Sequence, residues 1–341
     1  MTNPIGHRIR QGPGKSAEAL REKPDLPVHS RREFLGVAGA VGATALWGDF
    51  ARAASGDITF GYAAITWNGR DLDAIREVSE LGFPGIQLRA PIVRAYGDRP
   101  ASLKEILDRH NVVMVALSSG GMRIDPAFEK EDLEMHTKNA RFLKEVGGLY
   151  LQATDSRPGR DLTRDDYRRL GRVLTELGKR TADMGIPLGY HNHMHNIGER
   201  PDEVRWVLDA ADPRYVKLEL DVAHYQMGGG DPVEAIREYK DRLLFLHIKD
   251  LETPIPAGTG GPSRSYRFVE LGRGKVDLPA VFKALDEIKF RGWAVVELDE
   301  VPDNARTPKE SAQIGKTYLE GLGLSVWGNI RIRRTGSGGV R

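Results

Sequence analysis

Seven residues, YHNHMHN at 190 to 196, contain three of the nine histidines in this chain: His191, His193 and His195. Imidazole nitrogens bind metal ions, move protons and hydrogen-bond sugar hydroxyls, so this segment is a metal site, a sugar-binding surface or a polar loop. The sequence has no cysteine, which excludes disulfides, thiolate metal sites and cysteine nucleophiles. Any bound metal must therefore be held by histidine and carboxylate side chains.

Carboxylates and further histidines follow in three later strand-like stretches. These stretches are KLELDVAH (217–224), FLHIKD (245–250) and VVELD (295–299). Because side chains alternate between the two faces of a strand, residues two positions apart share a face. The residues that share the inward face are Gly189, His191 and His193; Glu219 and Asp221; Phe245, His247 and Lys249; and Val295 and Glu297. Each of the four stretches therefore offers an oxygen or nitrogen ligand on that face.

The elements that would position these side chains alternate regularly along the chain. Eight β-rich stretches are separated by segments of helical periodicity, which predicts parallel strands joined by helices. The predicted strands are 58–67, 85–90, 112–119, 149–155, 186–193, 216–224, 243–250 and 293–299. Eight such units in about 270 residues predict a (β/α)8 TIM barrel. An open doubly wound sheet is the alternative, but ITWNGRD stands where its glycine-rich phosphate turn would follow the first strand.

A barrel would bring the four ligand-bearing strands together. Working side chains lie at the carboxyl ends of barrel strands, so these ligands would meet at one end. Carboxylates crowded into a partly dry barrel mouth repel one another and raise each other's pKa unless a cation is present, so a divalent ion explains the set. The alternative is an ion-pair network in which Lys217, Lys249 or arginines replace the metal.

Motifs in the second half of the chain carry a family resemblance. GYHNH (189–193), LELDVAHY (218–225), LFLHIKD (244–250), LGRGKVDLPAVFKAL (271–285) and WAVVELD (293–299) resemble the sugar phosphate isomerase/epimerase family of xylose isomerase-like TIM barrels. That group also contains ketose 3-epimerases, inosose dehydratase and endonuclease IV. The resemblance covers most of residues 58 to 325 and is strongest after residue 186.

This resemblance implies one divalent ion. Mixed histidine and carboxylate ligation suits manganese, cobalt, zinc or magnesium, and manganese is expected first because a protein folded before export would acquire its metal in the cytoplasm. The implied ligands are His191, Asp221, His247 and Glu297. In the family the ligand on the fifth strand is commonly glutamate, whereas histidines occupy that stretch here. His191 is the expected replacement, and His193 or Glu199 from the following loop are the alternatives.

The same departure affects the expected reaction. Ketose epimerases of the family use two metal-bound glutamates on opposite faces of the substrate, and this chain keeps only Glu297 of that pair. The main expectation is an isomerase or epimerase of an unphosphorylated sugar, cyclitol or ketosugar that works by enediolate-type proton transfer. The alternative is a lyase or dehydratase that eliminates from a 3-keto-glycoside or inosose. Glu297 and His193 are the candidate catalytic residues in either reaction.

Two further alternatives carry less weight. An endonuclease IV-like phosphodiesterase would need more ligands and a basic DNA-binding face. A sugar-binding protein without turnover would keep the barrel but would not need Asp221, His247 and Glu297.

Other residues could bind substrate hydroxyls or a developing negative charge. The candidates are His193, Glu199, His224, Lys249, Gln87 and Arg89. The glycine- and proline-rich stretch 252–275 follows a ligand-bearing strand and is predicted to be a lid or substrate loop. His195 is expected on the surface of its loop.

The N-terminal segment has the features of a twin-arginine export signal. SRREFLGVAGAVGATALW (30–47) joins an Arg-Arg pair to an apolar run that is too short to span a bilayer, and ARA (51–53) offers a signal peptidase site. We therefore expect residues 1–54 to be removed after contact with the twin-arginine export machinery, without stable membrane insertion. The protein is then expected in the periplasm or secreted.

The remaining chain divides into a predicted barrel, residues 55–326, and a glycine-rich basic tail, residues 327–341, expected to be flexible. A formal net charge of +2 gives no general attraction to nucleic acid, so the expected partner is a small carbohydrate. The family resemblance is compatible with a homodimer, although no segment identifies an interface.

Overall fold

The structure is a computed structural model, which describes residues 58–254 and 265–326. The predicted signal segment 1–54 and the predicted tail 327–341 lie outside the described residues. Within the described residues, no helix is both long and apolar enough to cross a membrane.

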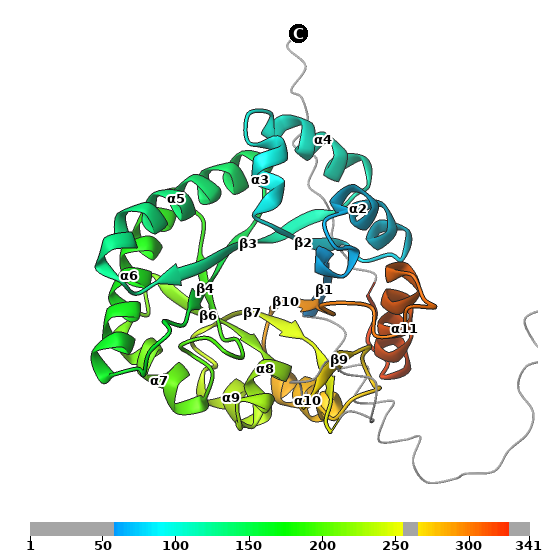
Figure 1. The fold of residues 1–341 in the computed structure, drawn as a ribbon. Coiled ribbons are helices and arrows are strands. Elements are labelled where there is room, and N and C mark those ends of the chain that lie inside the picture. Colours follow the sequence, from blue (N-terminus) through cyan, green and yellow to red (C-terminus); the bar gives the residue numbers. More distant parts are fainter. Residues whose placement is uncertain (1–57, 255–264, 327–341) are drawn as a thin grey trace, which may run out of the picture. The chain divides into compact units, whose positions relative to one another are not determined.

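Eight parallel strands close into a barrel, with each strand hydrogen-bonded to two neighbours (Figure 1). The strands are β1 (Ile58–Ala63), β2 (Gly85–Arg89), β3 (Val113–Arg123), β4 (Tyr150–Ser156), β5 (Leu188–His191), β6 (Val216–Asp221), β7 (Leu243–Ile248) and β10 (Gly292–Val296). They follow one another around the barrel in chain order, and β10 pairs with β1 to close it. The (β/α)8 prediction is confirmed, and the open-sheet alternative is wrong.

Helices form a ring around the strands (Figure 1). They are η1 (Ala64–Trp67), α2 (Asp71–Glu80), α3 (Pro91–Tyr96), α4 (Pro100–Arg109), η2 (Pro126–Phe128), α5 (Glu129–Val146), α6 (Arg164–Ala182), α7 (Pro201–Ala210), α8 (Val222–Met227), α9 (Pro232–Glu238), α10 (Leu278–Glu287) and α11 (Pro308–Gly321). Local sequence explains where many begin: α6 starts with a Thr163–Asp166 capping box, and several others have proline in their first turn. Their apolar faces pack on the outside of the strands and form the main core.

A second, smaller apolar cluster fills the inside of the barrel. It consists of Ala63, Val115, Ala116, Phe245, Trp293 and Val295, and we call these residues the barrel floor. Tyr150 stacks on Phe245 with ring centroids 5.3 Å apart. Gly189 gives Phe245 room, because a Cβ at this position would lie 3.3 Å from the Phe245 ring. The barrel is therefore a packed core and not an open channel.

The first predicted strand, 58–67, is too long, because β1 ends at Ala63, and so are the four ligand-bearing strands at their carboxyl ends. The predictions ran to residues 193, 224, 250 and 299, whereas β5, β6, β7 and β10 end at His191, Asp221, Ile248 and Val296. The reason is clearest at Asp221, whose Oδ1 accepts hydrogen bonds from the backbone amides of Ala223 and His224 and so begins α8. The functional side chains consequently lie at the last strand positions and in the segments directly after them.

The predicted lid region contains a short hairpin of β8 (Asp250–Glu252) and β9 (Arg267–Val269). The buried Asp250 carboxylate holds the base of this hairpin in place. It accepts hydrogen bonds from the backbone amides of Leu251, Gly272, Gly274 and Val276. A side chain at Gly274 would collide with Asp250, with its Cβ only 2.2 Å from the carboxylate. The hairpin is therefore fixed to the barrel, and residues 255–264 between its strands lie outside the described residues.

Candidate functional site

Strand register brings the predicted ligands next to one another. His191, the last residue of β5, pairs with Glu219 on β6, and Asp221, the last residue of β6, pairs with His247 on β7. His247 in turn pairs with Val295 on β10, and Glu297 follows two residues later. Period-two alternation then points these side chains to the same interior, as predicted.

The ligand atoms of His191, Asp221 and His247 lie within 4.8 Å of one another, and all three residues are buried. Glu297 joins them, because its Oε1 is 3.4 Å from His247 Nδ1. The predicted four-residue set is therefore brought together at one place. We call His191, Asp221, His247 and Glu297 the polar cluster.

The polar cluster contains buried nitrogen and oxygen atoms that lack hydrogen-bond partners. These atoms are His191 Nδ1, Asp221 Oδ2 and His247 Nδ1. Buried polar atoms without partners are costly, and two nitrogens and a carboxylate oxygen are ligands that manganese, cobalt and zinc accept. The residues present therefore fit a single divalent cation, with Glu297 as a further oxygen ligand.

Two neighbours determine which nitrogen of His247 faces the cluster. Gln87 Oε1 lies 2.9 Å and Glu219 Oε1 lies 2.6 Å from His247 Nε2. Both oxygens accept, so Nε2 carries a ring hydrogen, and Nδ1 faces Asp221 Oδ2 at 3.6 Å. Such an orienting contact behind a histidine ligand is typical of metal sites. Gln87, predicted to bind substrate, therefore contacts His247 instead of standing free at the mouth.

The carboxylates of Glu219 and Glu297 favour positive charge at His247, and His247 in turn favours the ionised form of Glu297. Burial raises the pKa of Glu219 to about 7, and Gln152 donates a hydrogen bond of 3.0 Å to its carboxylate. Burial alone would lower the pKa of His247, but Glu219 and Glu297 raise it well above its ordinary value. For Glu297, burial opposes ionisation, yet His247 and Lys249 hold its pKa well below the usual range. Carboxylates that favour a second proton on His247 also favour a metal cation beside it.

Lys249 is fully buried next to the polar cluster. Its Nζ donates to Glu297 Oε1 at 2.9 Å and to Asp299 Oδ1 at 2.5 Å, and it lies 3.9 Å from the centre of the Phe268 ring. The ion-pair alternative is therefore realised in part. Asp221 Oδ2 stays 4.0 Å from Nζ and has no hydrogen bond, so Lys249 does not replace a metal at Asp221.

Lys217 is the other lysine named in the ion-pair alternative. Its Nζ donates to the backbone carbonyl oxygen of Asp241 at 3.4 Å and lies apart from the polar cluster. Its side chain therefore takes no part in neutralising the carboxylates at the barrel mouth.

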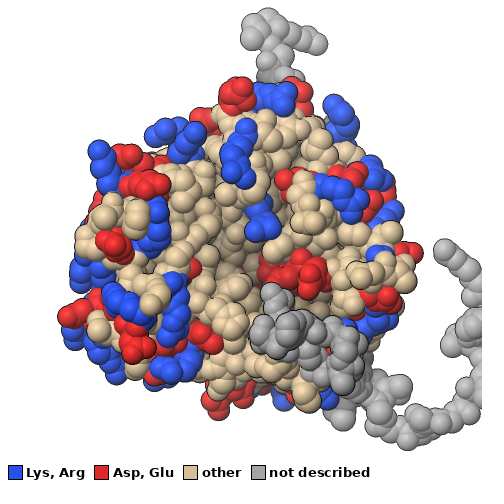
Figure 2. Space-filling view, in the orientation of Figure 1, with Lys and Arg blue, Asp and Glu red and all other residues tan. Residues whose placement is uncertain are grey.

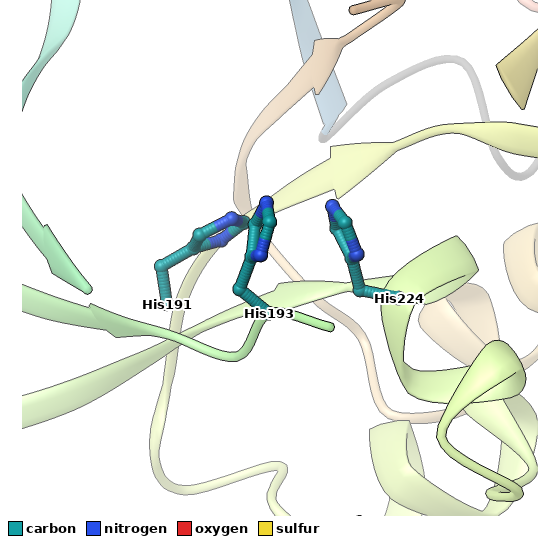
Figure 3. Close-up of side chains that lie close together, drawn as sticks. All are labelled: His191, His193 and His224. Atoms are coloured by element: carbon teal, nitrogen blue, oxygen red, sulfur yellow. The ribbon is translucent and has the colours of Figure 1, made fainter. Parts of the chain in front are cut away.

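His193 and His224 form a second group beside His191 (Figure 3). The rings of His193 and His224 have centroids 3.8 Å apart, and their planes are tilted by 35°. His191 lies further off, with its ring centroid 5.8 Å from that of His193 and 6.0 Å from that of His224. Burial and the Lys249 charge hold the pKa of His224 well below its ordinary value, so His224 is neutral.

Three further predicted residues lie outside these groups. Glu199 Oε2 accepts a hydrogen bond of 3.1 Å from the backbone amide of His195 and lies 3.7 Å from Arg157. Arg89, at the end of β2, is exposed. His195 is exposed in its loop, as expected. Of the histidines in YHNHMHN, His191 and His193 face the site and His195 does not.

Several site residues were not identified from the sequence. Asn192 is buried and joins β5 to β6: its Oδ1 accepts from the backbone amide of Asp221 at 3.0 Å, and its Nδ2 donates to the backbone carbonyl oxygen of Asp221 at 3.2 Å. Gln152 on β4 donates to Glu219, and Asp299, in the segment after β10, accepts from Lys249. Only the D in VVELD, two residues after Glu297, gave any local signal for Asp299.

The surface view shows a hollow at the centre of the barrel face, with acidic side chains on one border (Figure 2). On the described part of this face, lysine and arginine side chains are interspersed with aspartate and glutamate around the rim. This distribution lacks the continuous basic surface that a nucleic-acid backbone would require.

Comparison with known proteins agrees with this architecture. A family model described as "Xylose isomerase-like TIM barrel" matches residues 75–318. The chain is 24% identical over 293 residues to inosose dehydratase of Geobacillus kaustophilus, covering 77% of this chain and 94% of that protein. It is 27% identical over 294 residues to inosose dehydratase of Lacticaseibacillus casei, covering 77% and 96%.

Among solved structures, the fold is similar to that of the IolI protein with a bound zinc atom. The TM-score is 0.66 at 20% identity, and the match covers 78% of this chain and 98% of the other. At this identity, the likeness establishes a common fold.

Proposed function

Because the chain belongs to the xylose isomerase-like TIM barrel family, we propose that it is a divalent-metal-dependent dehydratase of an unphosphorylated keto-cyclitol or ketosugar. The observation that carries the proposal is the set of unpartnered buried atoms on His191, Asp221 and His247 beside a single glutamate, Glu297. That the chain is an enzyme follows from its family and from relatives named as dehydratases.

The ligand set supports elimination over epimerisation. Inverting a carbon centre by the two-glutamate route requires a proton acceptor on each face of the substrate, and β5 ends in His191 where the second glutamate would stand. Elimination needs one base that removes the C–H proton and a proton donor, so that the departing oxygen leaves as water or as an alcohol when its C–O bond breaks. The sequence-based main expectation of an isomerase is therefore replaced by its alternative, a lyase, which the names of the relatives also support.

The chain's own residues would prepare this reaction in three ways. Gln87 and Glu219 hold the His247 ring in place, and Lys249 holds the Glu297 carboxylate. Burial of the polar cluster excludes water and strengthens each charge interaction. When bound, the divalent ion would polarise the substrate oxygen beside the C–H bond and make that proton more acidic.

Manganese remains the expected ion, and cobalt and zinc are the alternatives. Two histidines and two carboxylates suit these three ions better than magnesium, which prefers oxygen ligands alone. The zinc atom in the similar IolI structure supports a divalent ion without selecting among them.

The decisive experiment combines metal analysis with a turnover assay on the chain from residue 55 to 341. We expect about one divalent ion per chain by mass spectrometry, and formation of a conjugated ketone, seen by ultraviolet absorbance, from an inosose or a 3-keto-glycoside. Asp221→Asn and Glu297→Gln should lose the activity, whereas Glu238→Gln, which removes an exposed ion pair with Arg205, should retain it. Exchange of the substrate α-proton with deuterium without elimination would favour an isomerase and overturn the proposal.

We further infer that the protein is exported in its folded state through the twin-arginine pathway. The support is the SRREFL stretch and the following short apolar run, residues 30–47. Fractionation of the producing cells and N-terminal sequencing test this inference: a periplasmic form beginning near Ser55 is expected. A cytoplasmic protein that retains Arg31 and Arg32 would overturn it.

A further inference from the structure

One peptide group, that of Met194, contacts both histidines of the second group. His193 Nδ1 lies 2.7 Å from the Met194 carbonyl oxygen. The Met194 amide nitrogen lies 3.2 Å from His224 Nδ1 and donates to it. Met194 is buried, so water does not compete for either contact.

The two contacts require opposite arrangements of the ring hydrogens. A carbonyl oxygen only accepts, so His193 carries its hydrogen on Nδ1 and keeps a lone pair on Nε2. A backbone amide only donates, so His224 keeps its lone pair on Nδ1, and in the neutral ring the hydrogen is then on Nε2. At Nε2, His193 therefore accepts a hydrogen bond, whereas His224 donates one.

Lys249 offers His224 a competing contact, because its Nζ lies 3.3 Å from His224 Nε2. One neutral imidazole has a single lone pair and cannot accept from both the Met194 amide and Lys249. The ammonium has other partners in Glu297, Asp299 and the face of Phe268. The Met194 amide has a fixed direction and donates to His224, so the lone pair belongs on Nδ1.

We propose that the Met194 peptide fixes His193 and His224 in opposite tautomers, so that the pair recognises an α-hydroxyketone. His193 Nε2 accepts the hydrogen of the substrate hydroxyl, and His224 Nε2–H donates to the neighbouring carbonyl oxygen. The ring centroids are 3.8 Å apart, so the two rings lie side by side and can contact oxygens on adjacent carbons. The substrate part of this inference rests on the proposed function, whereas the tautomers follow from the contacts alone.

The tautomers also distinguish the two groups of potential metal ligands. With Nδ1 occupied by the Met194 amide and a hydrogen on Nε2, His224 has no free lone pair for a metal. His193 and His224 consequently form a substrate-recognition pair, and the metal belongs at the polar cluster, to which His191 contributes a ligand.

Nitrogen NMR of the mature chain labelled with ¹⁵N only in histidine tests the tautomers directly. Chemical shifts distinguish protonated from unprotonated ring nitrogens, and His193→Asn and His224→Asn identify the two rings. We expect His193 as the Nδ1–H tautomer and His224 as the Nε2–H tautomer, both without metal and with bound zinc. The same tautomer for both rings, or Nδ1–H for His224, would overturn the proposal whether or not the protein dehydrates an inosose.

A binding experiment tests the recognition step separately. An inosose should bind about tenfold more tightly than its analogue lacking the hydroxyl next to the ketone, since each lost hydrogen bond costs roughly that factor. His193→Asn keeps a polar atom near Met194 but removes Nε2, so it should abolish this preference while zinc binding is retained. If the tautomers are as proposed and the unmodified protein shows no preference, the substrate assignment is wrong. Absence of inosose turnover with the preference intact would overturn the dehydratase proposal alone.

Discussion

The barrel floor and the polar cluster are built on the same strands and have opposite chemistry. On β7, Phe245 belongs to the floor and His247 to the cluster; from β10, Val295 belongs to the floor and Glu297 to the cluster. Two residues along a strand thus separate tight apolar packing from unpartnered nitrogens and oxygens. The floor supplies stability and keeps water out from below, so the cluster can keep buried groups that would be unstable alone.

The largest expected effect is at the cluster itself. Asp221→Ala should remove the metal and reduce kcat/KM by a factor on the order of 10³ or more. The substitution deletes an oxygen ligand, and the bound metal contributes several kcal/mol of transition-state stabilisation. Metal content and steady-state turnover are the measurements. Asp221→Asn is the matched variant, since its side-chain oxygen can still accept from the Ala223 and His224 amides. Full activity in the alanine variant would contradict the assignment of Asp221.

A floor substitution should affect stability instead of chemistry. Phe245→Ala should lower the free energy of unfolding by about 3–5 kcal/mol, the usual cost of removing a buried aromatic ring. Urea denaturation measures this loss, with Leu72→Ala as the control at an exposed apolar residue. We expect the folded variant still to bind metal. Metal loss without a loss of stability would mean that floor and cluster are not separable.

His136 shows how a buried histidine behaves without a carboxylate cluster. It lies on α5 with Nδ1 2.6 Å from Ser119 Oγ, and burial lowers its pKa to about 4. Since the unfolded chain binds a proton near pH 6.5 and the folded protein does not, stability should fall as the pH drops from about 6.5 to 4, by about 3 kcal/mol from this group.

Denaturation of the unmodified protein and of His136→Asn across this pH range measures that contribution. The variant should show the shallower slope, because its side chain does not titrate. Equal slopes in the two proteins would assign the acid sensitivity to other groups.

A smaller effect is expected behind the cluster. Glu219→Gln keeps the size of the side chain but removes the charge that orients His247 through Nε2. Metal affinity should fall about 10–100-fold, as for other groups that support a histidine ligand. Competition with a chelating dye gives the affinity, and Glu238→Gln serves as the surface control. An unchanged affinity would show that Gln87 alone is sufficient to orient the ring.

The sequence alone determined the barrel and the inward position of the four ligands. Alternating hydrophobic periods give eight strands and their order, and the period of two along a strand places His247 above Phe245 and Glu297 above Val295. Strand formation and side-chain alternation depend on neighbouring residues, so the local sequence pattern is sufficient to predict them. The exact strand ends were missed because they depend on side chains such as Asp221 that begin a helix.

Tertiary structure alone decided how the ligands are supported. Gln87 reaches His247 from 160 residues away, and Lys249 meets Glu297 from 48 residues away. Met194 connects His193 to His224 through its backbone, which has no side-chain signal in the sequence. Closure of the barrel sets these contacts, because the stagger of the strands determines which residues on distant strands reach the same height. The sequence was therefore sufficient to identify the ligand residues, but the hydrogen-bond partners that assign their roles could be identified only in the tertiary structure.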